Sequence, residues 1–352
     1  MRRYEQNPVI RPADVPPSTP GMEVIGAFNA AATRFGDEII LLLRVAERPI
    51  PSGPDTICFP MADEVDGQPV LRRVELRRDD PDADASDPRA VVYKGHTYLS
   101  SISHLRLARS KDGFHFTVDP QPTLLPRGPY ERYGIEDPRI TKIGDTYWIA
   151  YTSVSDFGIT VSLASTQDFR SFTRHGVILP PENKDVALFP AETKHGYALL
   201  HRPYTRSLGS TPDIWLAYSP DLVHFGDHRH VAGVRPDSWE SVRIGAGTPP
   251  IMTDKGWLEL YHGADDKAYC LGLLLLDPDE PHIVRGRSRE PVMQPETPYE
   301  KAGFYGNVVF TCGWVVKDDG RVLIYYGVSD EATAVAETTL DELLARVDPV
   351  QA

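Results

Sequence analysis

Cysteine, long apolar runs and positive charge are all scarce in this sequence. Cys58, Cys270 and Cys312 are odd in number and show no paired spacing, so neither a disulfide framework nor a zinc site is indicated. No apolar run approaches the length of a membrane span, and residues 1–8 lack an apolar signal segment. We therefore expect a cytoplasmic protein that contacts no membrane and needs no metal.

Basic residues are outnumbered, with 37 Lys and Arg against 50 Asp and Glu, for a net charge of −13. Nucleic acids and anionic membranes repel such a chain, so neither is expected as a partner. An anionic ligand must then be held by a local group of basic side chains. The 352 residues and the 41% hydrophobic content are ordinary for a soluble globular protein.

Helical periodicity is rare, and a strand-rich unit recurs instead. Each unit has a turn with glycine, an apolar strand, a variable loop and a second apolar strand that ends in a turn. Five copies begin near residues 36, 144, 196, 256 and 320. Repeats of roughly 50–60 residues with several short strands predict an all-β fold, here a five-bladed β-propeller forming a single domain over residues 1–352.

The first unit is interrupted by an insertion at about residues 47–98, because its second strand, near residues 105–116, comes only after that gap. Residues 95–101 could begin a sixth blade, but the insertion lacks the rest of the unit, so five blades are preferred. Residues 9–23 are rich in proline and are expected to be extended. A short C-terminal helix is predicted at 339–346, capped by the threonine at 338 or 339.

The segment Glu136-Asp137-Pro138-Arg139 places two carboxylates and a guanidinium side by side. Pro138 favours an extended backbone at Asp137, and a strand follows. Adjacent side chains of a strand point to opposite faces, so we expect one carboxylate in a cleft and the other in the scaffold. The alternative is a turn in which a carboxylate caps backbone amides and pairs with Arg139.

In a propeller, residues at the entrances of the inner strands and in the loops beside them converge on one face. Asp137, Arg202, His262 and Asp330 occupy comparable points in the second to fifth units. We therefore expect these scattered residues to form one site.

Cationic side chains stand beside several of the buried strands. Lys184 follows Asn183, Arg202 ends an apolar strand, Arg243 precedes a Gly-rich turn, and His262 ends another strand. Two arginines, a lysine and a histidine suit a phosphate, because they combine forked hydrogen bonds with a point charge.

Each of these residues also has a structural interpretation. Lys184 can be merely exposed, Arg202 and Arg243 can pair with Asp185 or Glu240, and the histidine can be a satisfied core residue. The Gly-x-Gly at 245–247 is weak evidence for a nucleotide, since no strand–helix unit surrounds it.

An ordered series of motifs resembles glycoside hydrolase family 130, the family of β-mannoside phosphorylases and a few β-mannosidases. The series runs from about residue 28 to residue 336, nearly the whole chain. Its motifs are Glu-Asp-Pro-Arg at 136–139, Asn-Lys-Asp at 183–185, His-Arg-Pro at 201–203, Ile-Gly-Ala-Gly-x-Pro-Pro-Ile at 244–251, Tyr-His-Gly at 261–263, Asn-Val-Val-Phe at 307–310 and a late Tyr-Gly-x-x-Asp.

The resemblance implies a five-bladed propeller with Asp137 as the general acid. In the family's phosphorylases this acid is thought to donate its proton through the mannose 3-hydroxyl to the glycosidic oxygen, while phosphate attacks the anomeric carbon from the opposite face. Inverting hydrolases need a second carboxylate to activate water, whereas phosphate is already anionic. The implied product is α-mannose 1-phosphate, with inorganic phosphate as co-substrate and no cofactor.

By position, the resemblance also implies the ligands of each subsite. The expected phosphate ligands are Asn183, Arg202, Arg243, His262 and Tyr269, with Lys184 adjacent. Many members carry Lys where this chain has Arg243. The residues expected to bind the mannose are Asn29, Arg44, Glu136, Arg139, Asp185 and Asp330. His104 and Arg106 are expected near the acceptor-side sugar.

Three functions compete on this basis. A phosphorylase of β-manno-oligosaccharides is favoured by the basic residues at 202, 243 and 262; β-1,2-linked substrates are preferred and β-1,4-linked ones stay open. An inverting β-mannosidase is the second, because Glu240 stands beside the cluster. A non-catalytic carbohydrate-binding propeller is the third. A homo-oligomer is left open.

Overall fold

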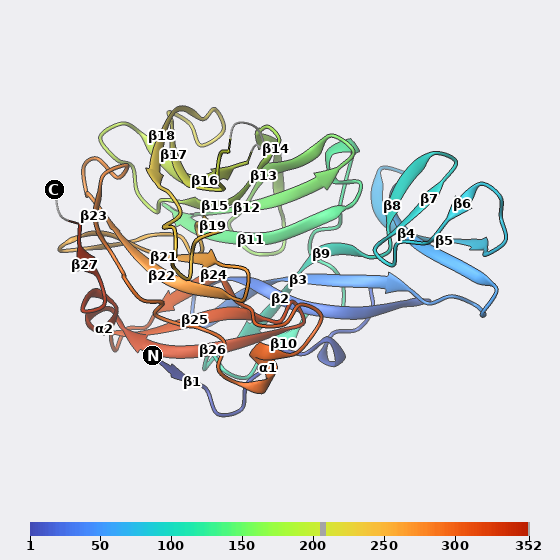
Figure 1. The fold of residues 1–352 in the computed structure, drawn as a ribbon, viewed down its shortest axis with the longest axis horizontal. Coiled ribbons are helices and arrows are strands. Elements are labelled where there is room, and N and C mark those ends of the chain that lie inside the picture. The colour runs from blue at the N-terminus through green and yellow to red at the C-terminus, as the bar shows by residue number, and fades with distance from the viewer. Residues whose placement is uncertain (205–208, 351–352) are drawn as a thin grey trace.

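The computed structural model describes residues 1–204 and 209–350. The described chain is almost entirely β-structure, with two short α-helices, and its strands group into five antiparallel units plus a projecting insertion (Figure 1). The all-β class predicted from the sequence is confirmed. Within the described residues, no helix is both long enough and apolar enough to cross a membrane.

The first two units share one sheet. Unit one contains β2 (Met22–Phe35), β3 (Glu38–Pro49), β9 (Ile102–Ser110) and β10 (Thr117–Val118). Unit two contains β11 (Gly134–Ile143), β12 (Thr146–Ser155), β13 (Gly158–Thr166) and β14 (Thr173–Leu179). Inside each unit the neighbouring strands are antiparallel, and a single parallel pairing of Gly134 with Ser103 joins the units.

Units three to five have sheets of their own. Unit three contains β15 (Asn183–Leu188), β16 (Tyr197–Pro203), β17 (Ile214–Ser219) and β18 (Gly226–Ala232). Unit four contains β19 (Arg243–Gly245), β20 (Ile251–Thr253), β21 (Gly256–Ala264), β22 (Tyr269–Leu276) and β23 (Val284–Arg287), with β27 (Asp348–Pro349) added at its edge. Unit five contains β24 (Val309–Val316), β25 (Arg321–Val328) and β26 (Ala332–Thr339), with β1 (Arg2–Arg3) at its edge.

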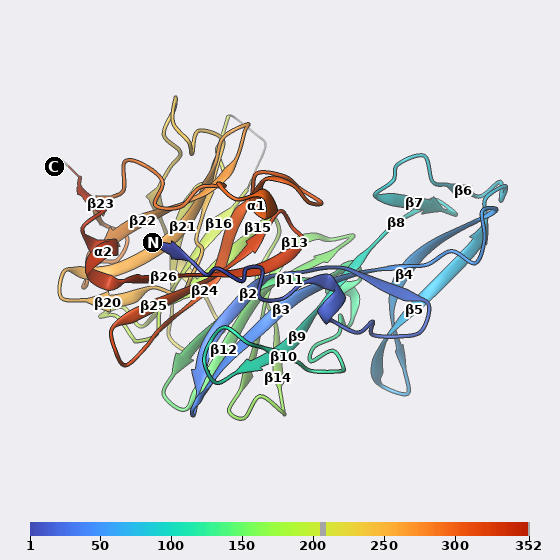
Figure 2. The same cartoon turned by 90° about the horizontal axis from the view of Figure 1, so that it is seen from below.

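The insertion forms two small sheets that stand away from the body of the molecule (Figures 1 and 2). One is the hairpin of β4 (Thr56–Val65) and β5 (Gln68–Arg77), and the other comprises β6 (Ala83–Asp84), β7 (Ala90–Tyr93) and β8 (His96–Leu99). Ile57, Phe59 and Val91 pack between these sheets as a separate core. Residues 95–101 therefore begin no sixth unit.

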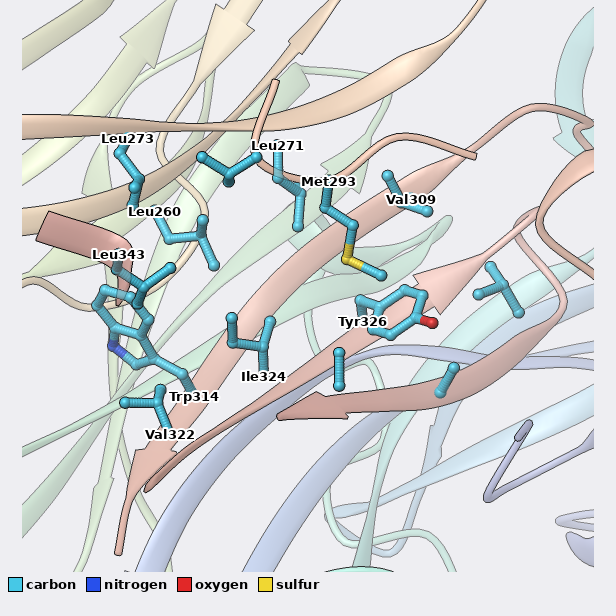
Figure 3. Packing of buried hydrophobic residues seen from close by; sticks show 14 of the residues in the cluster. Leu260, Leu271, Leu273, Met293, Val309, Trp314, Val322, Ile324, Tyr326 and Leu343 are labelled. Atoms are coloured by element: carbon cyan, nitrogen blue, oxygen red, sulfur yellow. The ribbon is translucent and has the colours of Figure 1, made fainter. Parts of the chain in front are cut away.

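Hydrophobic clusters pack consecutive units against each other. In Figure 3, Leu260 and Leu271 of unit four meet Trp314 and Ile324 of unit five. Comparable clusters join units one and two, two and three, and three and four. A fifth cluster places Leu323 of unit five against strands of unit one, so the packing returns to where it began.

The predicted C-terminal helix is present as α2 (Leu340–Leu344), and the Thr339 side chain accepts from the Glu342 amide at its start. Three short helical elements were not predicted: α1 (Pro298–Lys301) and the 3₁₀ turns η1 (Pro12–Asp14) and η2 (Pro129–Glu131). These are single turns, too short to carry a helical periodicity.

Three inner strands share one irregularity. β2, β11 and β15 each contain a bulge, in the middle of β2 and near the beginnings of β11 and β15. One residue in each bulge has a left-handed backbone, with φ of 47° at Asn29, 47° at Asp137 and 54° at Asp185. Asn and Asp tolerate this region best, and a bulge re-aims the side chain it carries. The extended backbone predicted at Asp137 is therefore wrong.

Candidate active site

The side chain of Asp137 is buried and held by two partners. Asn29 Nδ2 donates to its Oδ1 at 2.9 Å, and Arg44 Nη1 donates to the same oxygen at 3.1 Å. Arg44 Nη2 also donates to Glu136 Oε1 at 2.8 Å. The expectation that the two adjacent carboxylates face opposite sides is therefore wrong. The bulge breaks the strand alternation, and both carboxylates meet one guanidinium.

Arg44 is itself fixed by two residues that the sequence did not point to. Its Nε donates to Ser103 Oγ at 3.1 Å, and its guanidinium lies 4.8 Å from the centre of the Phe28 ring. Ser103 lies on β9, so its contact depends on a pairing of β3 with β9 across the whole insertion. A forked donor held in this way presents a fixed positive face to the acid.

Opposing influences act on the pKa of Asp137. Burial alone would raise it, but the charges of Arg44, Arg139 and Lys184 and the hydrogen bond from Asn29 outweigh burial, so the pKa is lowered. The carboxyl group is therefore ionised at neutral pH in the unliganded protein. A general acid must be protonated, so a ligand has to bring the proton or raise this pKa.

Asp330 belongs to the same electrostatic cluster. Burial raises its pKa to about 6; Asp137 and Glu136 add to the rise, while Arg44 and Lys184 oppose it. A carboxyl group with this pKa changes its charge within the physiological range. The Asp330 backbone also has a left-handed φ of 53°, at the turn after β25.

Arg139 links Asp137 to Asp185 and to the turn at residues 245–247. Its Nη1 donates to the Asp137 carbonyl oxygen at 2.9 Å, and its Nη2 lies 3.5 Å from Asp185 Oδ1. Its Nη2 and Nε also donate at 3.0 Å to the carbonyl oxygens of Ala246 and Gly247. The Gly-rich turn at 245–247 therefore supplies acceptors to an arginine.

Asp185 binds two of the predicted phosphate ligands. Its Oδ2 lies 3.0 Å from Arg202 Nη1 and 3.4 Å from His262 Nε2. Burial would raise the pKa of Asp185, but Arg202, His262 and Arg139 hold it well below its usual range. Burial lowers the pKa of His262 to about 4, so its imidazole is neutral at pH 7.

Gly245 makes this close approach possible. A Cβ at this position would lie 2.6 Å from Asp185 Oδ2 and 2.6 Å from His262 Cε1. Real Cβ atoms do not tolerate such contacts, so any side chain here would push the two groups apart.

A pocket of about 380 Å³ opens beside this group, and Asn183, Lys184, Arg202 and Arg243 all line it. Arg243 Nη1 donates to Tyr269 Oη at 3.0 Å. Within the described part of the chain, the buried Nε atoms of Arg202 and Arg243 and the Nδ1 atom of His262 have no hydrogen-bond partner. Unpaired buried donors are costly, and an anion in the pocket could bind the guanidinium groups of Arg202 and Arg243, which line it.

The residues predicted at comparable points are not all equivalent. Asp137 lies on the first strand of its unit, and its counterpart in unit three is Asp185. Arg202 and His262 instead lie on second strands, β16 and β21. The convergence still occurs, because the ends of the second strands lie against the first strands, as in the pairing of Arg202 with Lys184.

His104 and Arg106 do not join this cluster. Both are fully buried, with His104 Nε2 3.2 Å from Glu47 Oε1 and Arg106 Nη1 donating to the Pro16 carbonyl oxygen at 2.6 Å. Strand alternation explains the error, since both residues lie on the face of β9 opposite Ser103, which contacts Arg44. We attribute to them the anchoring of the proline-rich segment.

Glu240 is also engaged elsewhere. Its Oε2 accepts from Tyr261 Oη at 2.5 Å and lies 2.8 Å from Arg287 Nη2, and its Oε1 pairs with Arg235. Tyr261 precedes His262 on β21, so it points to the other face of that strand. The carboxylate that kept hydrolysis open is thus fully buried in an ionic network away from the pocket.

Two further residues near the site escaped prediction. The Phe310 ring lies 4.4 Å from that of His262 and 5.8 Å from the Arg139 guanidinium carbon. Glu259 is fully buried, its Oε1 accepts from the Gly247 amide at 3.0 Å, and burial raises its pKa well above the usual range. A lone Glu in an apolar strand gives no signal of this kind.

A larger cavity of about 840 Å³, lined by residues that include Phe35, Arg109 and Phe172, contains none of the predicted site residues. The site therefore rests on the convergence of charged groups rather than on cavity size. Among the described residues, no group of three or more His, Cys, Asp or Glu side chains is placed to hold a metal ion.

Comparison with known proteins identifies the family of the chain. The model of glycoside hydrolase family 130, described as β-1,4-mannooligosaccharide phosphorylase, matches residues 88–348. The chain belongs to this family. The resemblance expected from the motifs is thus confirmed.

Individual relatives in this family are mannoside phosphorylases. A β-1,2-mannobiose phosphorylase from Listeria innocua is 45% identical over 351 residues, covering 98% of each chain. A 1,2-β-oligomannan phosphorylase from Thermoanaerobacter is 42% identical over 68% of this chain and 79% of its own. The structure of the Listeria innocua enzyme in complex with β-1,2-mannobiose aligns with a TM-score of 0.89 at 44% identity, over 98% of both chains.

Proposed function

We propose that the protein is an inverting phosphorylase that cleaves β-1,2-linked mannosides with inorganic phosphate and releases α-mannose 1-phosphate. The observation that carries the proposal is the pocket of Asn183, Lys184, Arg202 and Arg243 beside the buried acid Asp137. The 45% identity to a β-1,2-mannobiose phosphorylase over 98% of the chain supports the linkage. β-1,4-Linked mannosides are the second candidate substrate, because the matching family model is described by that linkage.

Phosphate binding explains how an ionised Asp137 becomes an acid. The cations that lower its pKa include Lys184, which also lines the phosphate pocket. A phosphate dianion there offsets the positive charge and adds a negative one, and both changes raise the pKa of a neighbouring carboxyl group. Phosphate and proton thus enter the site together.

The reaction then balances without a second carboxylate. A phosphate oxygen forms the new bond to the anomeric carbon while the bond to the leaving oxygen breaks, and that oxygen receives the proton of Asp137. The proton lost by hydrogenphosphate as it becomes a phosphate monoester restores the acid. Asn29, Arg44, Glu136, Arg139, Asp185 and Asp330 are the residues we assign to the mannose, and His262 and Tyr269 complete the phosphate site.

Hydrolysis by an inverting β-mannosidase mechanism would require a carboxylate that activates water on the opposite face of the sugar. Glu240 was the candidate, but Tyr261, Arg235 and Arg287 occupy its oxygens. Asp185 is tied to Arg202 and His262 with a strongly lowered pKa, which makes it a weak base. Phosphorolysis is therefore preferred.

We also infer that the five units are the blades of a five-bladed β-propeller. Five hydrophobic clusters each join two consecutive units, including the fifth unit to the first, which supports a closed arrangement. Blades packed around a common axis would bring the bulged inner strands to one end of that axis.

We propose inorganic phosphate as the co-substrate, with no metal or organic cofactor, so chelation with EDTA is expected to leave the rate unchanged. We propose a cytoplasmic location because the sugar phosphate product is charged and does not cross membranes unaided.

The test is to incubate the protein with β-1,2-mannobiose, with and without inorganic phosphate, and to measure mannose 1-phosphate and free mannose. We expect mannose 1-phosphate only with phosphate, and at least a hundredfold loss of rate in Asp137→Asn, within the usual contribution of a general acid. Equal release of free mannose in both tubes would refute the proposal. β-1,4-Mannobiose in parallel decides the linkage.

A further inference from the structure

Three side chains lead from the proposed phosphate pocket to solvent. Asn183 lines the pocket and is buried against His201 on β16. His201 Nε2 lies 3.1 Å from Nδ1 of His228 on β18, which is exposed. The two imidazole rings meet edge to face, with centres 5.0 Å apart. The expectations from the sequence included neither histidine.

The contact between His201 and Asn183 has two states. His201 Nδ1 lies 3.1 Å from Asn183 Nδ2 and 3.2 Å from Asn183 Oδ1, so it is nearly equidistant from the donor and the acceptor. If Nδ1 carries the proton, it donates to Oδ1, and both N–H groups of Asn183 stay available. If Nδ1 is unprotonated, it accepts one hydrogen bond from Nδ2, so only one N–H of Asn183 stays available and Oδ1 is left without this partner.

The first state suits an anion better, because it offers two N–H donors instead of one. Phosphate oxygens accept hydrogen bonds from N–H groups, whereas a free amide oxygen repels them. Burial lowers the pKa of His201 to about 3, with repulsion from His228 as a smaller cause, so His201 stays neutral. The one proton on its ring therefore has to be on Nδ1 for phosphate to bind well.

His228 decides which nitrogen holds that proton. A protonated His228 can only donate, so its Nδ1–H bonds to His201 Nε2 and forces the proton of His201 onto Nδ1. We propose that His201 and His228 are positioning residues that turn the amide donors of Asn183 toward phosphate. This inference rests on the proposed function and deepens it, because it makes phosphate affinity respond to the protonation of an exposed histidine.

Charged groups surround His228 on every side that packs against it. Glu182 and Asp213 line the same pocket of about 650 Å³ as the two histidines. Asp213 Oδ2 lies 3.0 Å from His230 Nε2, and Asp227 pairs with the neighbouring arginine at 2.8 Å. Glu182 Oε1 accepts from a backbone amide at 3.3 Å. These carboxylates have partners of their own and leave the contact of His228 with His201 in place.

The experiment measures the KM for phosphate during phosphorolysis of β-1,2-mannobiose. His228→Glu places an ionised acceptor against His201 Nε2, which forces the wrong state of Asn183. We expect the phosphate KM to rise about tenfold, the effect of losing one hydrogen bond to a charged group, with the mannobiose KM within about twofold of wild type. His228→Gln can still donate, so its phosphate KM should stay within about threefold.

Arg229→Gln is the matched control for charge. It makes the net charge more negative by one on the residue adjacent to position 228 without touching His201. An equal rise in phosphate KM in Arg229→Gln and His228→Glu would overturn the inference, because the effect would then be long-range repulsion. Equal values for His228→Gln and His228→Glu would overturn it as well.

Two further measurements separate this inference from the proposed function. In Asn183→Ala, adding His228→Glu should raise the phosphate KM no further. A wild-type protein that cleaves without phosphate would refute the proposed function itself.

Discussion

Replacing Asp330 with asparagine should make the protein more stable, and the gain should depend on pH. The change keeps the shape of the side chain but removes a charge that the fold disfavours. In the folded protein the pKa of Asp330 is raised from 3.8 to about 6; burial is the main cause, Asp137 and Glu136 add to it, and Arg44 opposes it.

The sign and size of the stability change follow from the difference between the pKa values of Asp330 in the unfolded and folded states. Between the two pKa values the folded state retains a proton that the unfolded chain has released, so the free energy of unfolding of the wild type falls as pH rises. With 1.36 kcal/mol per pH unit, the loss is about 1 kcal/mol at pH 4.5 and about 3 kcal/mol at pH 8. Asp330→Asn avoids it, so its advantage should grow by about 2 kcal/mol between these pH values.

Urea unfolding of both proteins at pH 4.5 and pH 8 measures this advantage. Asp37→Asn is the control, because that side chain is 82% exposed and is expected to give the same small difference at both pH values. An Asp330→Asn advantage that is equal at the two pH values would refute the reasoning. If Asp330 binds mannose as proposed, the stabilised variant should also lose activity.

Two further substitutions test the centre of the site. Gly245→Ala should push Asp185 away from His262, lower the free energy of unfolding by about 1–3 kcal/mol and raise the phosphate KM. Gly226→Ala is the control, because no atom lies within 4 Å of its added Cβ, and it should change neither quantity. Equal melting temperatures and equal phosphate KM values for the two variants would contradict the packing argument. Glu259→Gln should change the stability by less than about 1 kcal/mol, because burial raises the pKa of this carboxyl group and disfavours its charged form; a loss above about 3 kcal/mol in urea unfolding would contradict this reasoning.

The repeat could be predicted because each unit begins with a turn that a local sequence pattern marks. Glycines at 36, 144, 196, 256 and 320 mark the turn before an apolar strand in each unit, and all five have positive φ. Turn chemistry and alternation therefore fixed the number and order of the strands. The insertion lacks the full repeat, so the pairing of its strands, from the ten-residue β4 and β5 to the two-residue β6, could not be predicted.

The candidate site was predictable as a set of residues but not as a geometry. Asp137 and Asp185 turn into the site because their strands are bulged, and a bulge depends on the register with a partner strand, which no local pattern reveals. The same limit explains His104, whose partner Glu47 lies on β3 beyond the insertion. The residue types of the site can therefore be identified from the sequence, whereas the face of the sheet on which each side chain lies depends on how the strands pair.

The pairing of β1 with β26 has a consequence for how the chain is made. Arg2 pairs with Glu337 across 335 residues, and Arg3 Nε donates to the buried Glu300 at 2.7 Å. Arg2 is synthesised 335 residues before Glu337, so this edge of unit five can form only after all the other units have left the ribosome. Substitution of Arg2 or Arg3 would therefore disturb this late pairing rather than the folding of the earlier units.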